Sequence, residues 1–194
     1  MKNENLVKIT GKVVHVYSYN QTTVLSIRTI YGSKIPNYPQ VKFYGELAAK
    51  AALIEVGDTV VVEGHYVSRI NVVDDRNTYK QEIIGRMVEK QEDETKGYLN
   101  EVSLSGKIVK LTECREGVIM IVIKTRFKKY VNNIMAFIYP SDVKEILDNY
   151  KVNDIVKVKG NIQTKKRVYP DITRYYQDLT LREIEMIKRN DTEE

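Results

Sequence analysis

Apolar and polar residues alternate along most of this chain, and the clearest alternating stretch occurs twice. Residues 56–64 read Val-Gly-Asp-Thr-Val-Val-Val-Glu-Gly, and residues 152–160, 96 positions later, read Val-Asn-Asp-Ile-Val-Lys-Val-Lys-Gly. In each copy a tight turn precedes a strand with alternate valines on one side, such as Val60 and Val62, and a glycine ends the regular run. We therefore interpret the chain as a duplication of one small β domain.

A long strand with a glycine near its middle opens each repeat, at residues 7–16 and 102–111. Gly11 and Gly106 stand where such a strand must bend to serve both sides of a barrel. Further apolar runs predict second and third strands at residues 24–29 and 41–44 of the first repeat, and at residues 119–125 and 134–138 of the second. Residues 17–22 and 112–117 are polar, so we predict hairpin loops there.

The period of the apolar residues becomes helical after each third strand. The apolar stripes are Leu47, Ala51 and Ile54 in the first repeat, and Val143, Ile146, Leu147 and Tyr150, after Pro140-Ser141, in the second. After the repeated stretch each repeat continues with a polar segment, residues 68–77 or 163–173, and a last strand, residues 79–83 or 175–179. We predict that the polar segments are loops.

The order of three strands, a helix and two strands within about 90 residues is typical of the OB-fold, a five-stranded Greek-key barrel. The predicted fold class is therefore mostly β, with two tandem OB-fold barrels that each carry one short helix between strands three and four. The predicted divisions are residues 1–88 for the first domain, 89–97 for a charged linker, 98–188 for the second domain, and 189–194 for a frayed tail.

The composition limits the function classes. The net charge is +5, and it is uneven, since the first 97 residues carry 13 basic and 12 acidic residues and the remainder carry 18 and 14. A polyanionic partner that contacts mainly the second half is therefore expected. Cys114 is the single cysteine, and the start of the sequence lacks the apolar run of a secretion signal. We expect a cytoplasmic protein that does not span a membrane.

Motifs for catalysis are not found in the sequence. His15 and His65 have no cysteine or acidic residues at metal-ligand spacing, and the mixed charges around Cys114 do not favour a thiolate. Phosphate-binding glycine loops and nucleophile motifs are also missing. We therefore expect no enzyme activity, no cofactor and no metal site.

Four segments of the first repeat resemble the bacterial and phage single-stranded DNA-binding proteins (SSB). They are residues 5–11, the block Val-Lys-Phe-Tyr-Gly-Glu-Leu-Ala at 41–48, residues 57–64 with Arg69 after them, and residues 79–83. The second repeat keeps residues 100–106, 158–166 and 174–179 but loses the aromatic-Gly-x-Leu-Ala block, so it resembles a diverged copy.

The resemblance implies that aromatic residues at two positions of the first repeat stack on bases. These positions match Tyr44 and Tyr38, and strand parity independently places Lys42 on the same outer surface as Tyr44, beside Arg28. Tryptophans of the family's loops are absent, and Tyr31 is the predicted substitute. The remaining predicted binding residues of this repeat are Arg69, Arg76 and Tyr79.

Basic and aromatic residues interleave in two segments of the second repeat. The predicted binding residues there are Arg126, Phe127, Lys128, Lys129, Tyr130, Lys165, Lys166, Arg167, Tyr169, Arg174 and Tyr175. Such segments flank the groove of an OB-fold and suit a nucleic-acid strand. The alternative is that they form solvated hairpins with no ligand.

We therefore predict a non-catalytic protein that binds single-stranded DNA with little sequence preference, in replication, repair, recombination or transfer. Two alternatives remain open, an OB-fold module that assembles with a replication or conjugation protein, and a binder of single-stranded RNA. The resemblance also implies four OB-folds per particle, hence a homodimer formed through open strand edges of the first repeats. Family members that recruit partners end in a Gly/Pro/Gln-rich tail with an acidic tip, which residues 189–194 do not match, so a phage or plasmid origin is expected.

Overall fold

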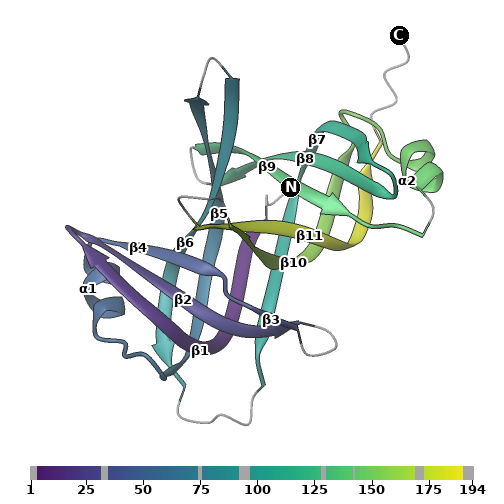
Figure 1. Cartoon of the computed structure of the whole chain (residues 1–194). Coiled ribbons are helices and arrows are strands. Elements are labelled where there is room, and N and C mark those ends of the chain that lie inside the picture. Colours follow the sequence, from purple (N-terminus) through teal and green to yellow (C-terminus); the bar gives the residue numbers. More distant parts are fainter. Residues whose placement is uncertain are drawn as a thin grey trace.

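Two β-barrels, each with one short helix, make up the computed structural model (Figure 1), which describes residues 4–31, 35–73, 76–91, 97–127, 130–141, 143–168 and 173–189. The first half contains β1 (Asn5–Tyr19), β2 (Thr22–Tyr31), β3 (Ile35–Asn37), β4 (Gln40–Tyr44), α1 (Glu46–Ala52), β5 (Thr59–Val73) and β6 (Arg76–Lys90). The second half contains β7 (Leu99–Arg115), β8 (Val118–Phe127), β9 (Tyr130–Ile138), α2 (Val143–Asn149), β10 (Ile155–Val168) and β11 (Thr173–Lys188).

Hydrogen-bonded neighbours close both barrels. The strand order is β1-β2-β4-β6-β5 in the first barrel, where β5 pairs back with β1, and β7-β8-β9-β11-β10 in the second, where β10 pairs back with β7. The β4–β6 and β9–β11 pairs are parallel, whereas the other pairs are antiparallel. This is the Greek-key order of the OB-fold, so the predicted fold class is confirmed.

The alternating pattern correctly identified the core. Val60 and Val62 in the first barrel are buried, as are Val156 and Val158 in the second. Helix α1 packs Ala48 and Ala51 into the first core, and α2 packs against the second core with half-buried side chains. Both predicted helices are therefore confirmed, and the second is held less deeply than the first.

The glycine of each opening strand lies where the backbone passes very close to its neighbour. A Cβ atom at Gly11 would collide with the carbonyl group of Arg28, and one at Gly106 would collide with that of Lys124. Only glycine allows β1 and β7 to bend this tightly against β2 and β8. The predicted bends are confirmed.

The two barrels are joined through their first strands. β1 pairs antiparallel with β7 from Asn5↔Leu104 to Thr10↔Leu99, so the outer edge of β1 is occupied within the chain. The predicted homodimer contact through open edges of the first repeats is therefore wrong at β1, because the barrel is closed and this edge is already paired. A homodimer stays a prediction from the sequence, and it requires another surface.

Asparagine side chains continue the hydrogen bonding beyond the last paired residues of β1 with β5 and of β7 with β10. Asn5 Nδ2 donates to the Tyr66 carbonyl (2.8 Å), and the Tyr66 N–H donates back to Asn5 Oδ1 (2.9 Å). Asn100 makes the same pair of bonds with Ile162, at 2.8 and 2.9 Å. The two asparagines are each 5% exposed, so these bonds are buried.

Residues 68–77 and 163–173 were predicted as loops, and the structure shows that this is wrong for most of them. β5 and β6 continue beyond the first barrel as a paired hairpin, the first arm (residues 68–81), and β10 and β11 continue as the second arm (residues 164–177). Each arm extends from its own barrel toward the other barrel (Figure 1). An arm outside the barrel has no core to alternate against, which is why the sequence pattern there is polar.

Each arm is attached to the opposite barrel by matching contacts. The Ser68 N–H of the first arm donates to Asn132 Oδ1 on β9 (3.1 Å), and the Thr164 N–H of the second arm donates to Asn37 Oδ1 on β3 (3.0 Å). In addition, the side chain of Gln81 bonds the backbone of Met135, and that of Gln177 bonds the backbone of Gln40. Each half therefore contacts the other through its arm, and the two sets of contacts are related by approximate two-fold symmetry.

Candidate nucleic-acid interface

Outward-facing side chains on β1, β2 and β4 lie in rows across the first barrel. Paired positions on neighbouring antiparallel strands point to the same face, so each row takes one residue from each strand. The rows are Tyr19–Thr22–Tyr44, Tyr17–Val24–Lys42 and His15–Ser26–Gln40. We call these positions the β1–β2–β4 face.

Three tyrosines give this face its aromatic surface. Tyr17, Tyr19 and Tyr44 are 56%, 65% and 41% exposed, so their rings are open to a ligand. Tyr17 and Tyr19 are two positions apart on one strand, and Tyr44 lies at the opposite edge of the row that contains Tyr19. Exposed rings on one sheet surface are suitable for stacking of unpaired bases.

Lys42 lies within this face in a compact charge cluster. Its Nζ is 2.6 Å from Glu82 Oε1, and Lys80 Nζ lies 3.2 Å from the same oxygen. Burial raises the pKa of the Glu82 carboxyl, but the hydrogen bonds and charges of Lys42 and Lys80 outweigh this and lower its pKa below the usual value. The cluster keeps a net charge of about +1, because two lysines share one carboxylate.

Pairs of opposed cations lie at the bent end of both barrels. Lys12 pairs with Arg28 across β1 and β2, and Lys107 pairs with Lys124 across β7 and β8. Like charges directly opposite each other destabilise a sheet, and a phosphate placed between them would relieve the repulsion. Arg126 lines the same groove as Lys107 and Lys124, which makes this the more basic of the two ends.

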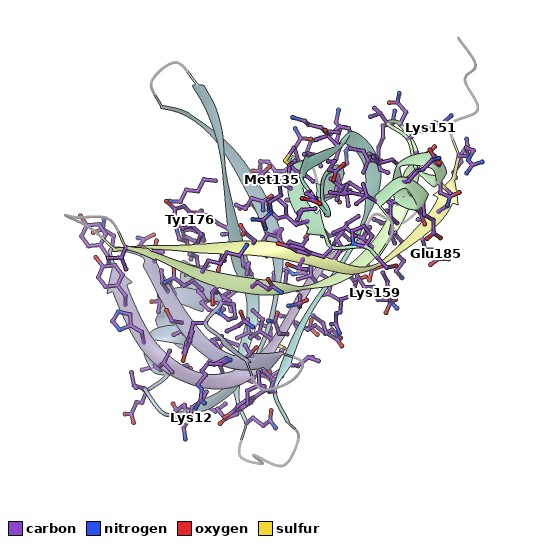
Figure 2. The ribbon with its side chains drawn as sticks, turned by 45° about the vertical axis from the view of Figure 1, so that its right-hand side comes forward. Lys12, Met135, Lys151, Lys159, Tyr176 and Glu185 are labelled. Atoms are coloured by element: carbon purple, nitrogen blue, oxygen red, sulfur yellow. The ribbon has the colours of Figure 1, made fainter. Side chains whose placement is uncertain are left out.

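A groove of about 590 Å³ separates the β1–β2–β4 face from the second arm. Its walls include His15 and Tyr38 from the first half, and Lys165 and Tyr176 from the arm. Figure 2 labels Tyr176 where the arm passes over the first barrel. The structure thus brings together Tyr38 and Lys165, which the sequence predicted in separate repeats.

Lys165 is less available than the sequence suggested. Its Nζ lies 2.9 Å from Asp178 Oδ2 and 5.9 Å from the centre of the Phe137 ring, within the range of a cation–π contact. Because its charge is balanced by Asp178, we expect Lys165 to attract phosphate weakly.

Tyr44 and Tyr130, also predicted in separate repeats, line a second pocket of about 410 Å³. Tyr44 ends β4 of the first barrel, whereas Tyr130 begins β9 of the second. The two rings come together because the first arm holds the start of β9 against the first barrel.

The corresponding face of the second barrel is more apolar. Its rows are Lys110–Val122–Met135 and Thr112–Met120–Phe137. Met135 and Phe137 occupy the positions that hold glutamine and lysine on β4 of the first barrel, and both are half-buried. The two faces therefore have different binding chemistry.

Of the predicted site residues, the structure describes the side chains of Arg28, Tyr38, Lys42, Tyr44, Arg126, Tyr130 and Lys165. The other predicted side chains lie outside the described residues, namely Tyr31, Arg69, Arg76, Tyr79, Phe127, Lys128, Lys129, Lys166, Arg167, Tyr169, Arg174 and Tyr175.

Sequence reasoning missed His15, Tyr17, Tyr19 and Tyr176. Tyr17 and Tyr19 were placed in a loop, although β1 continues to Tyr19 and turns at residues 20–21. The available signal was the continued alternation of outward His15, Tyr17 and Tyr19 around the half-buried Val16.

The described ranges contain neither a cluster of metal-ligating side chains nor a membrane-spanning helix. No three His, Cys, Asp or Glu side chains in this part of the chain come close enough to hold a metal ion. No helix among the described residues is long and apolar enough to cross a bilayer.

The fold matches solved structures of the SSB from Thermus aquaticus. The wild-type protein aligns over 100% of this chain and 98% of its own, with a TM-score of 0.69 and 16% identity. A deletion mutant of the same protein gives the same TM-score and identity over 99% of this chain. No family model matches the sequence, and no curated protein matches it either. The resemblance to SSB proteins is thus confirmed at the level of the fold.

Proposed function

We propose that this chain binds single-stranded DNA with little sequence preference and catalyses no reaction. The observation that carries the proposal is the β1–β2–β4 face, where three exposed tyrosines and Lys42 stand in register on an OB-fold surface. The fold it shares with the Thermus aquaticus SSB supports the same conclusion. Every base offers a π face, so stacking on such a surface discriminates little between sequences.

In this proposal rings and cations have separate tasks. Tyr17, Tyr19 and Tyr44 stack on bases that lie across the face, while Lys42 offsets nearby phosphate charge. The strand continues through the groove under the second arm, past Tyr38 and Tyr176. Of the predicted processes, we propose that the protein protects exposed strands in replication, repair, recombination or transfer in the cytoplasm.

Single-stranded RNA would find the same rings and cations, so competition between DNA and RNA strands decides between them. One observation favours the assembly role as a second function. The second barrel presents Met135 and Phe137 where the first presents glutamine and lysine, a surface that suits an apolar protein partner. We propose this role for the second barrel only.

The test is fluorescence anisotropy with a labelled strand of about 30 nucleotides, measured free and as a duplex. We expect the free strand to bind much more tightly, because stacking needs unpaired bases. Tyr17→Ala and Tyr44→Ala should each weaken binding by about 1 to 3 kcal/mol. Equal affinity for strand and duplex would contradict the proposal.

Tyr98→Ala is the matched control. Tyr98 is 37% exposed, close to the 41% of Tyr44, but it precedes β7 and lies outside the β1–β2–β4 face. Its replacement should leave the dissociation constant unchanged. If all three variants lose the same affinity, the loss reflects general surface effects and the face is not the site.

A further inference from the structure

A residue in the wall of the pocket shared by Tyr44 and Tyr130 carries a buried hydrogen-bond donor without a partner among the described residues. Asn132 lines this pocket and is only 4% exposed. Its Oδ1 accepts from the Ser68 N–H (3.1 Å), but its buried Nδ2 has no hydrogen-bond partner among the described residues. The orientation of the amide is determined, because a backbone N–H can only face the oxygen.

A buried donor without a partner is costly, so the site favours a ligand that brings an acceptor. Neither lysine nor arginine is among the described residues that line the pocket, and Val67, Ile84 and Val131 make part of its wall apolar. His65 also lines the pocket, but a phosphate there would lose its hydration without gaining a permanently charged partner. A flat, uncharged group with a carbonyl oxygen suits the walls better.

We infer that this pocket receives one unstacked nucleobase and selects for a base that carries a carbonyl acceptor. The inference rests on the proposed function and extends it. It adds one site that prefers certain bases to a surface that otherwise binds the strand by stacking. Tyr44 and Tyr130 supply the rings, and the pocket of about 410 Å³ lies within the usual range for small-ligand sites. Thymine offers two carbonyl oxygens that project from its ring, whereas the acceptors of adenine are nitrogens within the ring itself.

The pocket exists only in the assembled chain. Tyr44 and Ser68 belong to the first half, and Tyr130 and Asn132 belong to the second. The Ser68 Oγ also accepts from the Asn133 N–H (2.9 Å), which holds the start of β9 in place. The first arm therefore positions the donor for the base.

The experiment compares oligo-dT and oligo-dA of about twelve nucleotides, which fits the site size of OB-folds. Its readout is the ratio of the dissociation constants for dA and dT in wild type and in Asn132→Asp. The aspartate keeps an oxygen for the Ser68 N–H but replaces the donor by an acceptor, which suits the amino group of adenine. We expect the ratio to fall by about five- to tenfold. A ratio that stays within about twofold of wild type would overturn the inference.

Asn37→Asp is the matched control, because Asn37 is also 4% exposed and accepts from the Thr164 N–H at the symmetric position. It adds the same charge outside the pocket, so it should leave the ratio unchanged. An equal drop in both variants would assign the effect to charge alone and overturn the inference.

A measurement on the wild-type protein covers the case in which Asn132→Asp does not fold. The side-chain amide resonance of Asn132 should move on addition of oligo-dT and much less on addition of oligo-dA. A resonance that stays fixed with dT, while the ring signals of Tyr44 move, would refute the pocket and leave the proposed function intact. Failure of the wild type to bind either strand would instead refute the proposed function.

Discussion

Replacing Asn5 by alanine should destabilise the protein strongly, although the change removes only a small polar side chain. Asn5 forms two buried hydrogen bonds with the backbone of Tyr66, at 2.8 and 2.9 Å, beyond the last pair between β1 and β5. Alanine leaves a buried N–H and a buried C=O without partners. Each such group costs about 1 to 3 kcal/mol, and we expect a total loss of about 2 to 6 kcal/mol.

For a chain of this length, a loss of this size lowers the melting temperature by about 4 to 24 °C. Circular dichroism during heating and urea unfolding measure the change. Asn100→Ala should behave alike, since Asn100 makes the same two bonds with Ile162. Asn149→Ala, at an exposed position at the end of α2, is the control and should stay within about 0.5 kcal/mol of wild type. If Asn5→Ala melts at the same temperature as this control, the Asn5 amide does not substitute for a backbone hydrogen-bonded pair between β1 and β5, and the reasoning fails.

The other predictions concern charge. Replacing Lys107, Lys124 and Arg126 together by alanine should flatten the slope of log affinity against log salt by up to about 2, since each phosphate contact contributes roughly 0.7. Lys165→Ala should hardly change this slope, because Asp178 balances the charge of Lys165. A larger change of slope from Lys165→Ala than from the triple variant would contradict this assignment. The pKa of Glu82 is lower in the folded protein than the ordinary value of 4.5. The ionised carboxylate therefore stabilises the fold at pH values above 4.5, and this stabilisation is lost as the pH falls through the lower folded pKa. Urea unfolding should therefore show a gap between wild type and Glu82→Gln at neutral pH that closes in acid, and a gap independent of pH would contradict the proposed role of Lys42 and Lys80.

Local patterns in the sequence predicted the parts of this fold that depend on a core. Val60 and Val62 alternate because one side of β5 is buried, and Gly11 is required by a backbone contact that any OB-fold barrel makes at its bend. Parity also placed Lys42 and Tyr44 on the outer surface correctly, but the expected position of Lys42 beside Arg28 is wrong, because Lys42 pairs with Val24 and Arg28 lies four positions further along β2. Each of these signals arises within a single barrel.

The features that the sequence did not predict arise between the barrels. The arms have no alternation because their partners are polar groups of the opposite half, such as the side chains of Asn132 and Asn37. The pairing of β1 with β7 cannot be predicted from the pattern of side chains, because it is formed by backbone hydrogen bonds. Tyr44 and Tyr130 meet in one pocket only after both of these contacts form.

The β1–β7 pairing has a consequence for how the molecule behaves on dilution and how it can change. Two separate copies of a barrel would part at low concentration, whereas barrels within one chain meet at an effective concentration that dilution cannot lower. Two identical copies would also share every substitution. In the joined chain a mutation changes one barrel alone, which permits glutamine and lysine on the first face where methionine and phenylalanine stand on the second.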